Sequence, residues 1–162
     1  MHVRAAQLIQ LLDLRPHPEG GYYRELFRSS AVVTPTNRRD ARSALTTIYF
    51  LLTGETKSRW HRVWSDEAWH LYEGGPLELL ELDLRSGRLV KNRLAPVGDG
   101  AGSPVHVIPA GAWQAARTVG PYTLVGCTVA PGFDFSDFHL LADDPSRAAL
   151  VSERWPEVAD LL

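Results

Sequence analysis

Two histidines and two acids that can hold or move protons are concentrated in the middle of the short segment Ser58–Gly75. They are His61, Asp66, Glu67 and His70, and tryptophan and tyrosine residues alternate with them. A histidine and a glutamate that converge in a concave, aromatic-walled site form an acid–base pair or part of a metal site. A buried His–Glu hydrogen bond that only satisfies two polar groups is the structural alternative.

This segment predicts a β-hairpin, because two apolar and aromatic runs, Arg59–Trp64 and Glu67–Tyr72, flank a Ser-Asp turn. Side chains along a strand alternate between the two faces of a sheet. The alternation places His61 on one face of the first strand and Glu67 on one face of the second. We therefore expect these two side chains to meet on a single inward face.

The rest of the chain predicts short strands separated by turns, with helices only near the two ends. Ala5–Leu14 has the apolar spacing of an amphipathic helix, and Ser146–Val151 is a helical stretch in the tail. This pattern is typical of an antiparallel sandwich or a small barrel. The expected strands are Tyr22–Ser29, Ser43–Leu52, Leu77–Leu84, Arg88–Leu94, Val105–Ile108 and Tyr122–Ala130.

Length and composition indicate one domain, residues 1–162, with room for a real core. Seventeen basic residues are interleaved with nineteen acidic ones, so we expect no basic face that tracks nucleic acid. The single cysteine, Cys127, excludes an intramolecular disulfide and lies in an apolar run that predicts a buried, inert thiol. Because the sequence shows no signal-peptide core and no membrane-length apolar run, we expect a cytoplasmic protein that does not engage a membrane.

Three further segments are expected to be structural. His17 and Glu19 lie in a turn dominated by proline and glycine, Ala31–Arg42 is polar and predicts an exposed connector, and Pro131–Leu141 combines phenylalanines with acids. In that last segment we expect the phenylalanines to fill core and the acids to bind backbone amides.

Two separated stretches resemble the two sequence motifs of the cupin superfamily. His61, Glu67 and Gly74 occupy the register of the first motif, and Pro109 and Gly111 match the turn of the second. The resemblance implies an all-β fold, a double-stranded β-helix or jelly-roll barrel with short N- and C-terminal helices, and a homodimer. It is closer still to one uncharacterised subfamily, the cupin-5 type, related in fold to sugar-nucleotide epimerases. The segments that carry this likeness are Pro16–Glu25, Ser58–Leu80, Pro109–Gln114 and Gly126–Phe138.

The resemblance implies that a metal-loaded cupin holds its metal with three histidines and one glutamate. In this chain Val63 and Gln114 stand at the second and third histidine positions, which leaves His61 and Glu67 as strong ligands. If a divalent transition metal binds, His61, Glu67 and Gln114 would hold it. Because the ligand set is incomplete, we expect a protein without a metal cofactor. A metal-dependent lyase or oxygenase is the less favoured alternative.

The epimerase-like cupins use a histidine as general base without a metal, and the resemblance implies this role for His61. Glu67 would orient the imidazole or share its proton. The expected ligand is a small molecule such as a sugar or a nucleotide-sugar derivative, which the protein would isomerise or epimerise. A non-catalytic cupin that only binds a small ligand is the alternative from another class.

Five residues are the expected ligand-binding side chains around this pair. Arg59, on the predicted face of His61, would bind a phosphate or carboxylate. Gln114 would hydrogen-bond a sugar or base, as would Tyr49 if its strand turns it inward, and Trp113 would stack on the ligand. His70 would join only if a bulge turned it inward. The structural alternatives are core packing for Trp113 and an ion pair with a local acid for Arg59.

Overall fold

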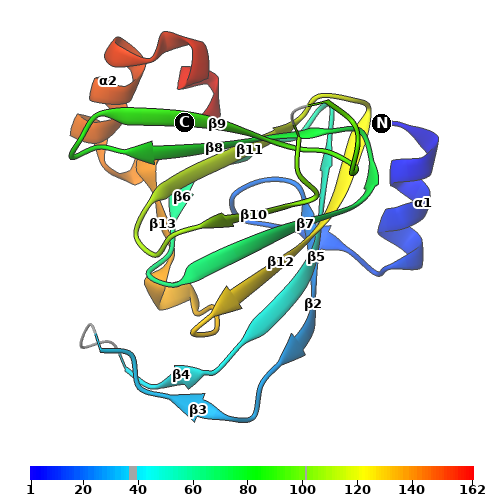
Figure 1. Cartoon of the computed structure of the whole chain (residues 1–162), viewed down its shortest axis with the longest axis horizontal. Coiled ribbons are helices and arrows are strands. Elements are labelled where there is room, and N and C mark those ends of the chain that lie inside the picture. Colours follow the sequence, from blue (N-terminus) through cyan, green and yellow to red (C-terminus); the bar gives the residue numbers. More distant parts are fainter. Residues whose placement is uncertain (37–39, 101) are drawn as a thin grey trace.

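Two antiparallel sheets pack face to face in the computed structural model, which describes residues 1–36, 40–100 and 102–162 (Figure 1). The six-stranded sheet has the order β1 (Arg15–Pro16), β2 (Tyr22–Arg28), β5 (Thr46–Thr53), β12 (Tyr122–Ala130), β7 (Asp66–Gly74) and β10 (Val105–Ile108). The five-stranded sheet has the order β13 (His139–Leu140), β6 (Ser58–Arg62), β11 (Trp113–Thr118), β8 (Leu77–Asp83) and β9 (Arg88–Leu94). The predicted jelly-roll barrel is confirmed.

The main core lies between the two sheets, because alternate residues of each strand face inward. Phe50, Trp69 and Val125 of the six-stranded sheet pack there against Leu77 and Leu79 of the other sheet. All five side chains are at most 1% exposed. The same alternation brings polar residues of these strands into the barrel interior, where they need hydrogen-bond partners.

Helices cover the outer faces at the two ends of the chain, as predicted. α1 (Val3–Leu11) places Ala5 and Leu8 against Leu51 and Leu124 of the six-stranded sheet. α2 (Pro145–Arg154) packs on the outer face of the five-stranded sheet, where its Val151 joins a buried cluster. The short 3₁₀ helices are η1 (Phe135–Asp137), η2 (Leu141–Asp143) and η3 (Pro156–Leu161). None of the helices in these described ranges is long and apolar enough to cross a membrane.

The predicted hairpin between the strands of His61 and Glu67 is wrong. β6 belongs to the five-stranded sheet and β7 to the six-stranded sheet, so the chain crosses between the sheets through Val63, Trp64 and Ser65. Two strands joined by three residues look like a hairpin in sequence, because strand content and turn signals are local. Which sheet each strand joins is decided by its pairing with distant strands, β11 for β6 and β12 for β7.

A bulge in β6 also changes which residues face inward. Gln114 of β11 pairs with His61 and Ala116 pairs with Ser58, so β6 holds one more residue than β11 between these points. An extra residue resets the alternation of side chains. Ser58 therefore lies on the side of His61, whereas the prediction placed Arg59 there.

Part of the predicted connector Ala31–Arg42 forms a small ladder instead. β3 (Val32–Val33) pairs with β4 (Arg42–Ser43), and both extend below the barrel in Figure 1. The Arg42 guanidinium binds both carboxylate oxygens of Asp137 in η1, at 3.0 and 3.1 Å. This ion pair fixes the ladder to the segment that follows β12. Residues 37–39 of the predicted connector lie outside the described residues.

Candidate active site

A cavity of about 110 Å³ lies between the sheets, beside the turn before β2 and the segment after β12. An apolar cavity of about 150 Å³ holds a benzene ring, so the enclosed space here suits a group of only a few heavy atoms. Its apolar wall comes from Ile48, Phe50, Val63, Val129, Phe133 and Phe135, and its potential proton carriers are His17, Glu19, Tyr23, His61, Glu67 and Cys127.

His61 is fixed at both nitrogens of its ring. Its Nδ1 lies 2.8 Å from the carbonyl oxygen of Arg59. Because a carbonyl oxygen only accepts, we assign the ring hydrogen of neutral His61 to Nδ1, which leaves a lone pair on Nε2. That Nε2 lies 3.3 Å from Oε2 of Glu19. The side chain is 2% exposed. Burial lowers the pKa of His61, and the nearby charge of Glu67 only partly opposes this.

Glu19 reaches this position through a sharp turn. Gly20 has φ +110°, and a Cβ atom there would lie 2.0 Å from the carbonyl oxygen of Lys57, so the close approach needs glycine. The buried Glu19 carboxyl accepts a hydrogen bond through Oε1 from Ser58 Oγ at 2.7 Å. Burial raises the pKa of Glu19, against the opposing influence of His17 and the Ser58 hydrogen bond. Burial thus disfavours the charged form of this carboxyl.

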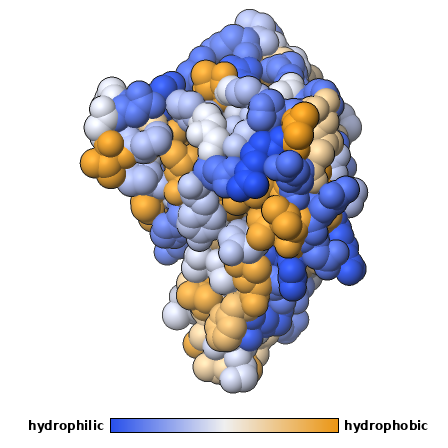
Figure 2. Space-filling model, turned by 90° about the vertical axis from the view of Figure 1, so that its right-hand side faces the viewer, coloured by the Kyte–Doolittle hydropathy of each residue, from blue (hydrophilic) through white to orange (hydrophobic). Residues whose placement is uncertain are grey.

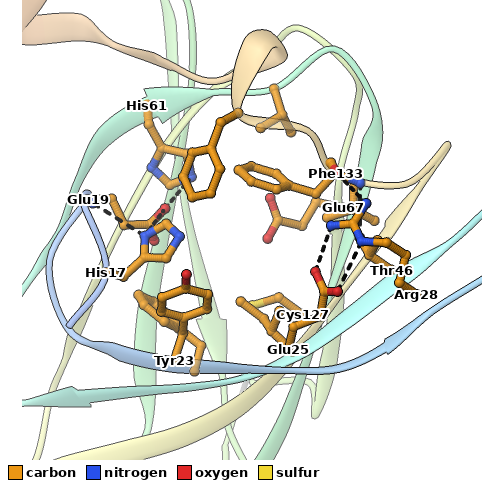
Figure 3. A pocket seen from close by; sticks show the side chains of 15 residues that line it. His17, Glu19, Tyr23, Glu25, Arg28, Thr46, His61, Glu67, Cys127 and Phe133 are labelled. Carbon is orange, nitrogen blue, oxygen red and sulfur yellow. Dashed lines mark hydrogen bonds and ion pairs between the residues drawn. The ribbon is translucent and has the colours of Figure 1, made fainter. Parts of the chain in front are cut away.

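His17 completes a chain of three proton carriers. Its Nδ1 accepts a hydrogen bond from the backbone N–H of Glu19 at 3.3 Å and lies 3.4 Å from Oε2 of the same residue. Figure 3 shows His17 and His61 both converging on the Glu19 carboxyl. Burial lowers the pKa of His17. Glu19 Oε2 thus lies between His17 Nδ1 and His61 Nε2.

Glu67 belongs to a second buried network. Its Oε2 accepts from Gln114 Nε2 at 2.5 Å, and Gln114 Oε1 accepts from Trp69 Nε1 at 3.0 Å. Burial raises the pKa of Glu67, while the charge of His61 opposes the shift. Burial also raises the pKa of the adjacent Cys127 thiol well above its ordinary value. Cys127 is therefore buried, as predicted, and it also lines the cavity.

The residues at the cupin metal positions do not fit a transition metal. Val63 offers no donor atom, and the amide oxygen of Gln114 already accepts from the Trp69 indole. His61 directs Nε2 at Glu19 rather than at Glu67. Within residues 1–36, 40–100 and 102–162, no group of three or more His, Cys, Asp or Glu side chains is arranged to hold a metal ion.

The structure separates the other predicted ligand-binding residues from the cavity wall. Arg59 donates to the carbonyl oxygen of Pro18 at 2.7 Å. Tyr49 lies on the outer face of β5, packed edge-to-face against Tyr72, so its strand does not turn it inward. Trp113 is 4% exposed in the core beneath the C-terminal helices. Each of these positions follows from strand phase, which the β6 bulge and the sheet pairings determine.

His70 and Gln114 complete the set of predicted ligand-binding residues. His70 alternates with Glu67 along β7 and is half-buried, away from the residues that line the cavity. Gln114 is fully buried behind Glu67 and donates to that carboxyl. Of the predicted site residues, the structure therefore brings His61 and Glu67 to the cavity and Gln114 to its supporting network.

Sequence reasoning missed the part of the site that precedes β2. His17 and Glu19 were assigned to a structural turn, yet both line the cavity. The available signal was the family-like segment Pro16–Glu25, in which His17 and Glu19 stand beside the glycine pair Gly20 and Gly21. The prediction for the phenylalanine segment is refined rather than reversed, since Phe133 and Phe135 pack on one another and line the cavity.

An ion pair lies beside the phenylalanines. Arg28 binds both carboxylate oxygens of Glu25, at 3.0 and 2.6 Å, and donates to the Phe133 carbonyl oxygen at 3.0 Å. Figure 3 shows this pair on the side of the cavity opposite His17 and Glu19. The cavity therefore has a proton-carrying side and an ion-paired side.

Comparison with solved structures finds close relatives of this architecture. A hypothetical protein from Leishmania major is 32% identical, with 97% of this chain and 95% of that chain aligned at a TM-score of 0.82. A protein from Shewanella oneidensis is 30% identical, with 98% and 96% aligned at a TM-score of 0.83. Oxalate decarboxylase from Bacillus subtilis has a TM-score of 0.59 at 14% identity, over 93% of this chain and 37% of that chain, so this likeness shows the fold alone.

No curated protein matches the sequence. The family model described as Cupin superfamily (DUF985) matches residues 6–141, which include both sides of the cavity. This match, together with the barrel and its two relatives of at least 30% identity, shows that the chain belongs to this family of the cupin superfamily.

Proposed function

We propose that the cavity binds a small oxygenated metabolite, a sugar or nucleotide-sugar derivative, and that His61 moves a proton at the carbon next to its carbonyl group. The reaction is an isomerisation or epimerisation without a metal. The observation that carries the proposal is the 3.3 Å approach of His61 Nε2 to Glu19 Oε2, with Nδ1 held by the Arg59 carbonyl. A carboxyl-paired imidazole of fixed orientation is suited to general-base work.

The position of the Glu19 proton determines whether His61 is free to act. When this proton points away from His61, the lone pair of His61 Nε2 is available to the ligand. When it faces His61, the base is masked. Lowered pKa values at both histidines keep the imidazoles neutral, which is the state that a base requires.

Proton balance requires a donor as well as an acceptor. His61 takes the proton from the carbon, and the electron pair of the broken C–H bond moves onto the carbonyl oxygen as an enolate. Glu67, whose pKa burial raises, supplies a protonated carboxyl to the cavity. Donation of the Glu67 proton to the opposite face of that carbon gives the epimer and leaves the abstracted proton on His61. The isomer forms when His61 returns its proton to the former carbonyl carbon while the hydroxyl proton of the first carbon passes to the enolate oxygen.

The size of the cavity limits which part of the ligand is enclosed. About 110 Å³ accommodates the reacting carbonyl end of a sugar but not a whole nucleotide sugar. The remainder of a larger ligand would lie toward the mouth, where Phe135 is 54% exposed. The Arg28–Glu25 pair lies along this route and offers both a donor and an acceptor to hydroxyl groups.

Solvent exchange tests the proposal directly. We would incubate the protein with a panel of aldoses, ketoses and nucleotide sugars in deuterium oxide and follow loss of carbon-bound proton signals by NMR. His61→Asn should slow exchange by about 100-fold or more. His2→Asn is the matched control, because His2 is exposed and asparagine also caps a helix. Absence of exchange with every saturating ligand would refute the proposed chemistry.

The non-catalytic alternative has a distinct signature in the same experiment. A cupin that only binds a ligand would retain affinity in His61→Ala and would show no exchange with any ligand that binds. The cavity supports binding in either case, because its apolar wall and buried polar groups surround a space open to small molecules.

The expected homodimer is a further part of the proposal. Figure 2 views the side that carries α1 and shows hydrophobic side chains grouped among hydrophilic ones. Exposed apolar residues on this side include Leu11 at 71%, Leu26 at 42% and Tyr72 at 54%. Sedimentation velocity would give the mass in solution, and Leu26→Glu should shift a dimer toward monomer, whereas Val97→Glu in a distant exposed loop should not.

A further inference from the structure

A second hollow lies on the outer face of the five-stranded sheet, away from the barrel interior. Its volume is about 460 Å³, and it lies between the end of β8 and the turn that precedes β11. Arg62, Arg85 and Arg147 contribute to its lining, together with Trp64 and Trp113. Arg62 follows His61 directly in β6, so alternation directs these two side chains to opposite faces of the sheet.

Arg62 is held in a fixed position by two indole rings. Its guanidinium carbon lies 4.4 Å from the Trp64 ring centroid and 4.7 Å from that of Trp113. Gly111 supports this arrangement, because a Cβ atom there would lie 2.9 Å from Trp64. Stacking covers the flat faces of a guanidinium and leaves its edge for hydrogen bonds. In the part of the chain that the structure describes, the buried Nε of Arg62 has no hydrogen-bond partner.

Two of the three charged groups that act on Arg62 are themselves guanidiniums. Burial is the largest cause that lowers the pKa of Arg62. The neighbouring charges of Arg147 and Arg85 lower this pKa further, and that of Asp144 raises it. Asp144 is already engaged, since its Oδ2 pairs with Arg147 at 3.1 Å and its Oδ1 accepts the backbone N–H of that residue. Clustered guanidiniums of this kind attract an anion.

Two carboxylates line the same hollow, and Asp83 is hydrogen-bonded within its own turn. Asp83 accepts the backbone N–H of Arg85 at 2.9 Å and the hydroxyl of Ser86 at 2.7 Å, which closes the turn after β8. Glu81 lies 4.0 Å from Nε2 of His106. With Asp144, three carboxylates stand against the three guanidiniums, so the charges balance while hydrogen-bond donors of the guanidiniums remain in excess.

We propose that this hollow is a second ligand site, which binds the phosphate group of a small soluble molecule through the edge of the stacked Arg62 guanidinium, with Arg85 and Arg147 contributing charge. A phosphate dianion accepts several hydrogen bonds from the planar fork of an arginine, which a neutral ligand matches less well. The concave shape and the net charge of −2 for the whole chain favour a small phosphate compound over a nucleic acid. The site is independent of the proton chemistry proposed for the barrel interior.

Titration with inorganic phosphate tests this site through the five tryptophan indole N–H signals. We expect the signals of Trp64 and Trp113 to shift in ¹H–¹⁵N spectra, while that of Trp69, which donates to Gln114, stays in place. Calorimetry in the same buffer gives the affinity. Arg62→Gln should weaken phosphate binding by about tenfold or more, the effect of losing a charge-assisted hydrogen bond.

Two further variants keep the test decisive if Arg62→Gln alters folding. Arg62→Lys retains the charge but removes the planar fork, so it should also weaken binding. Arg117→Gln removes the same charge from the same sheet at a residue that pairs with Glu78, and it should leave binding unchanged. Circular dichroism would confirm that each variant folds. His61→Asn should also bind phosphate normally, which separates this site from the proposed reaction.

Several outcomes would overturn the assignment. No shift with phosphate in the millimolar range, shifts spread over all tryptophans, or equal weakening by Arg62→Gln and Arg117→Gln would each exclude a built phosphate site. A parallel arm would measure co-sedimentation with phosphatidylcholine vesicles that contain phosphatidic acid. Arg62-dependent co-sedimentation without binding of free phosphate would reject a soluble ligand in favour of a lipid headgroup.

Discussion

His61 Nε2 lies 3.3 Å from Glu19 Oε2, although Glu19 precedes β2 and His61 lies in β6, far along the chain. Glu19 is held by the turn before β2, and His61 by the inward face of β6 in the other sheet. The contact therefore bridges the two sheets at the cavity wall. This contact and the buried groups around it lead to predictions about the pH dependence of the reaction and the stability of the fold.

The pH dependence of the proposed reaction reports on His61. Burial lowers the pKa of His61 from its ordinary value of 6.5, and the neutral imidazole is the active base. Exchange should therefore persist as the pH falls below 6.5 and decline only as it passes through the lowered pKa of the folded protein. The profile of kcat/KM for deuterium exchange measures this limb. A decline centred at or above 6.5 would contradict a buried, neutral His61.

Replacement of Glu67 by glutamine should change how stability depends on pH. Burial raises the pKa of Glu67 above its ordinary value of 4.5, so the folded state holds this proton more tightly than the unfolded chain. The contribution of a group with a raised pKa is fully present below the unfolded value and is lost as pH rises through the folded value. Glu67→Gln should thus gain stability relative to the natural protein as the pH rises from about 4 to about 7.

Urea denaturation at several pH values measures this difference. The glutamine oxygen can still accept from Gln114, so the buried network is retained in the variant. Glu153→Gln on exposed α2 is the matched control for the same chemical change. If the difference in unfolding free energy between Glu67→Gln and the natural protein does not vary with pH, burial does not raise the pKa of Glu67.

Removal of the Ser58 hydroxyl should weaken the folded state. Ser58 Oγ donates to Glu19 Oε1 at 2.7 Å within a buried environment. Ser58→Ala leaves that oxygen without this donor, and an unsatisfied buried polar group costs about 1–3 kcal/mol of unfolding free energy. Ser152→Ala on the exposed side of α2 should change stability by less than about 0.5 kcal/mol. Equal effects in the two variants would mean that Ser58 does not support Glu19.

Elemental analysis of protein purified without chelators tests the absence of a metal cofactor. We expect far less than stoichiometric transition metal, because Val63 has no donor atom and Gln114 is engaged by Trp69 and Glu67. The same measurement on His61→Ala and Glu67→Ala gives the control. Near-stoichiometric metal that disappears in both variants would replace the metal-free proposal with lyase, hydrolase or oxygenase chemistry.

Local sequence patterns were sufficient for the long strands of the barrel and for the inward direction of His61 and Glu67. Alternation of side chains is a property of each strand by itself, so β7 could be phased from Glu67, Trp69 and Leu71 without knowledge of its neighbours. The apolar spacing of the first helix and the turn residues between strands are equally local. The family motifs then identified the barrel, because they span most of the chain.

Only the tertiary structure decided which residues meet. The sheet that each strand joins depends on pairing with distant partners, and this placed β6 and β7 in opposite sheets rather than in a hairpin. The β6 bulge brought Ser58 rather than Arg59 to the inward side, and long-range folding carried His17 and Glu19 to His61. Contacts of this kind arise from closure of the barrel, which no local pattern of residue types encodes.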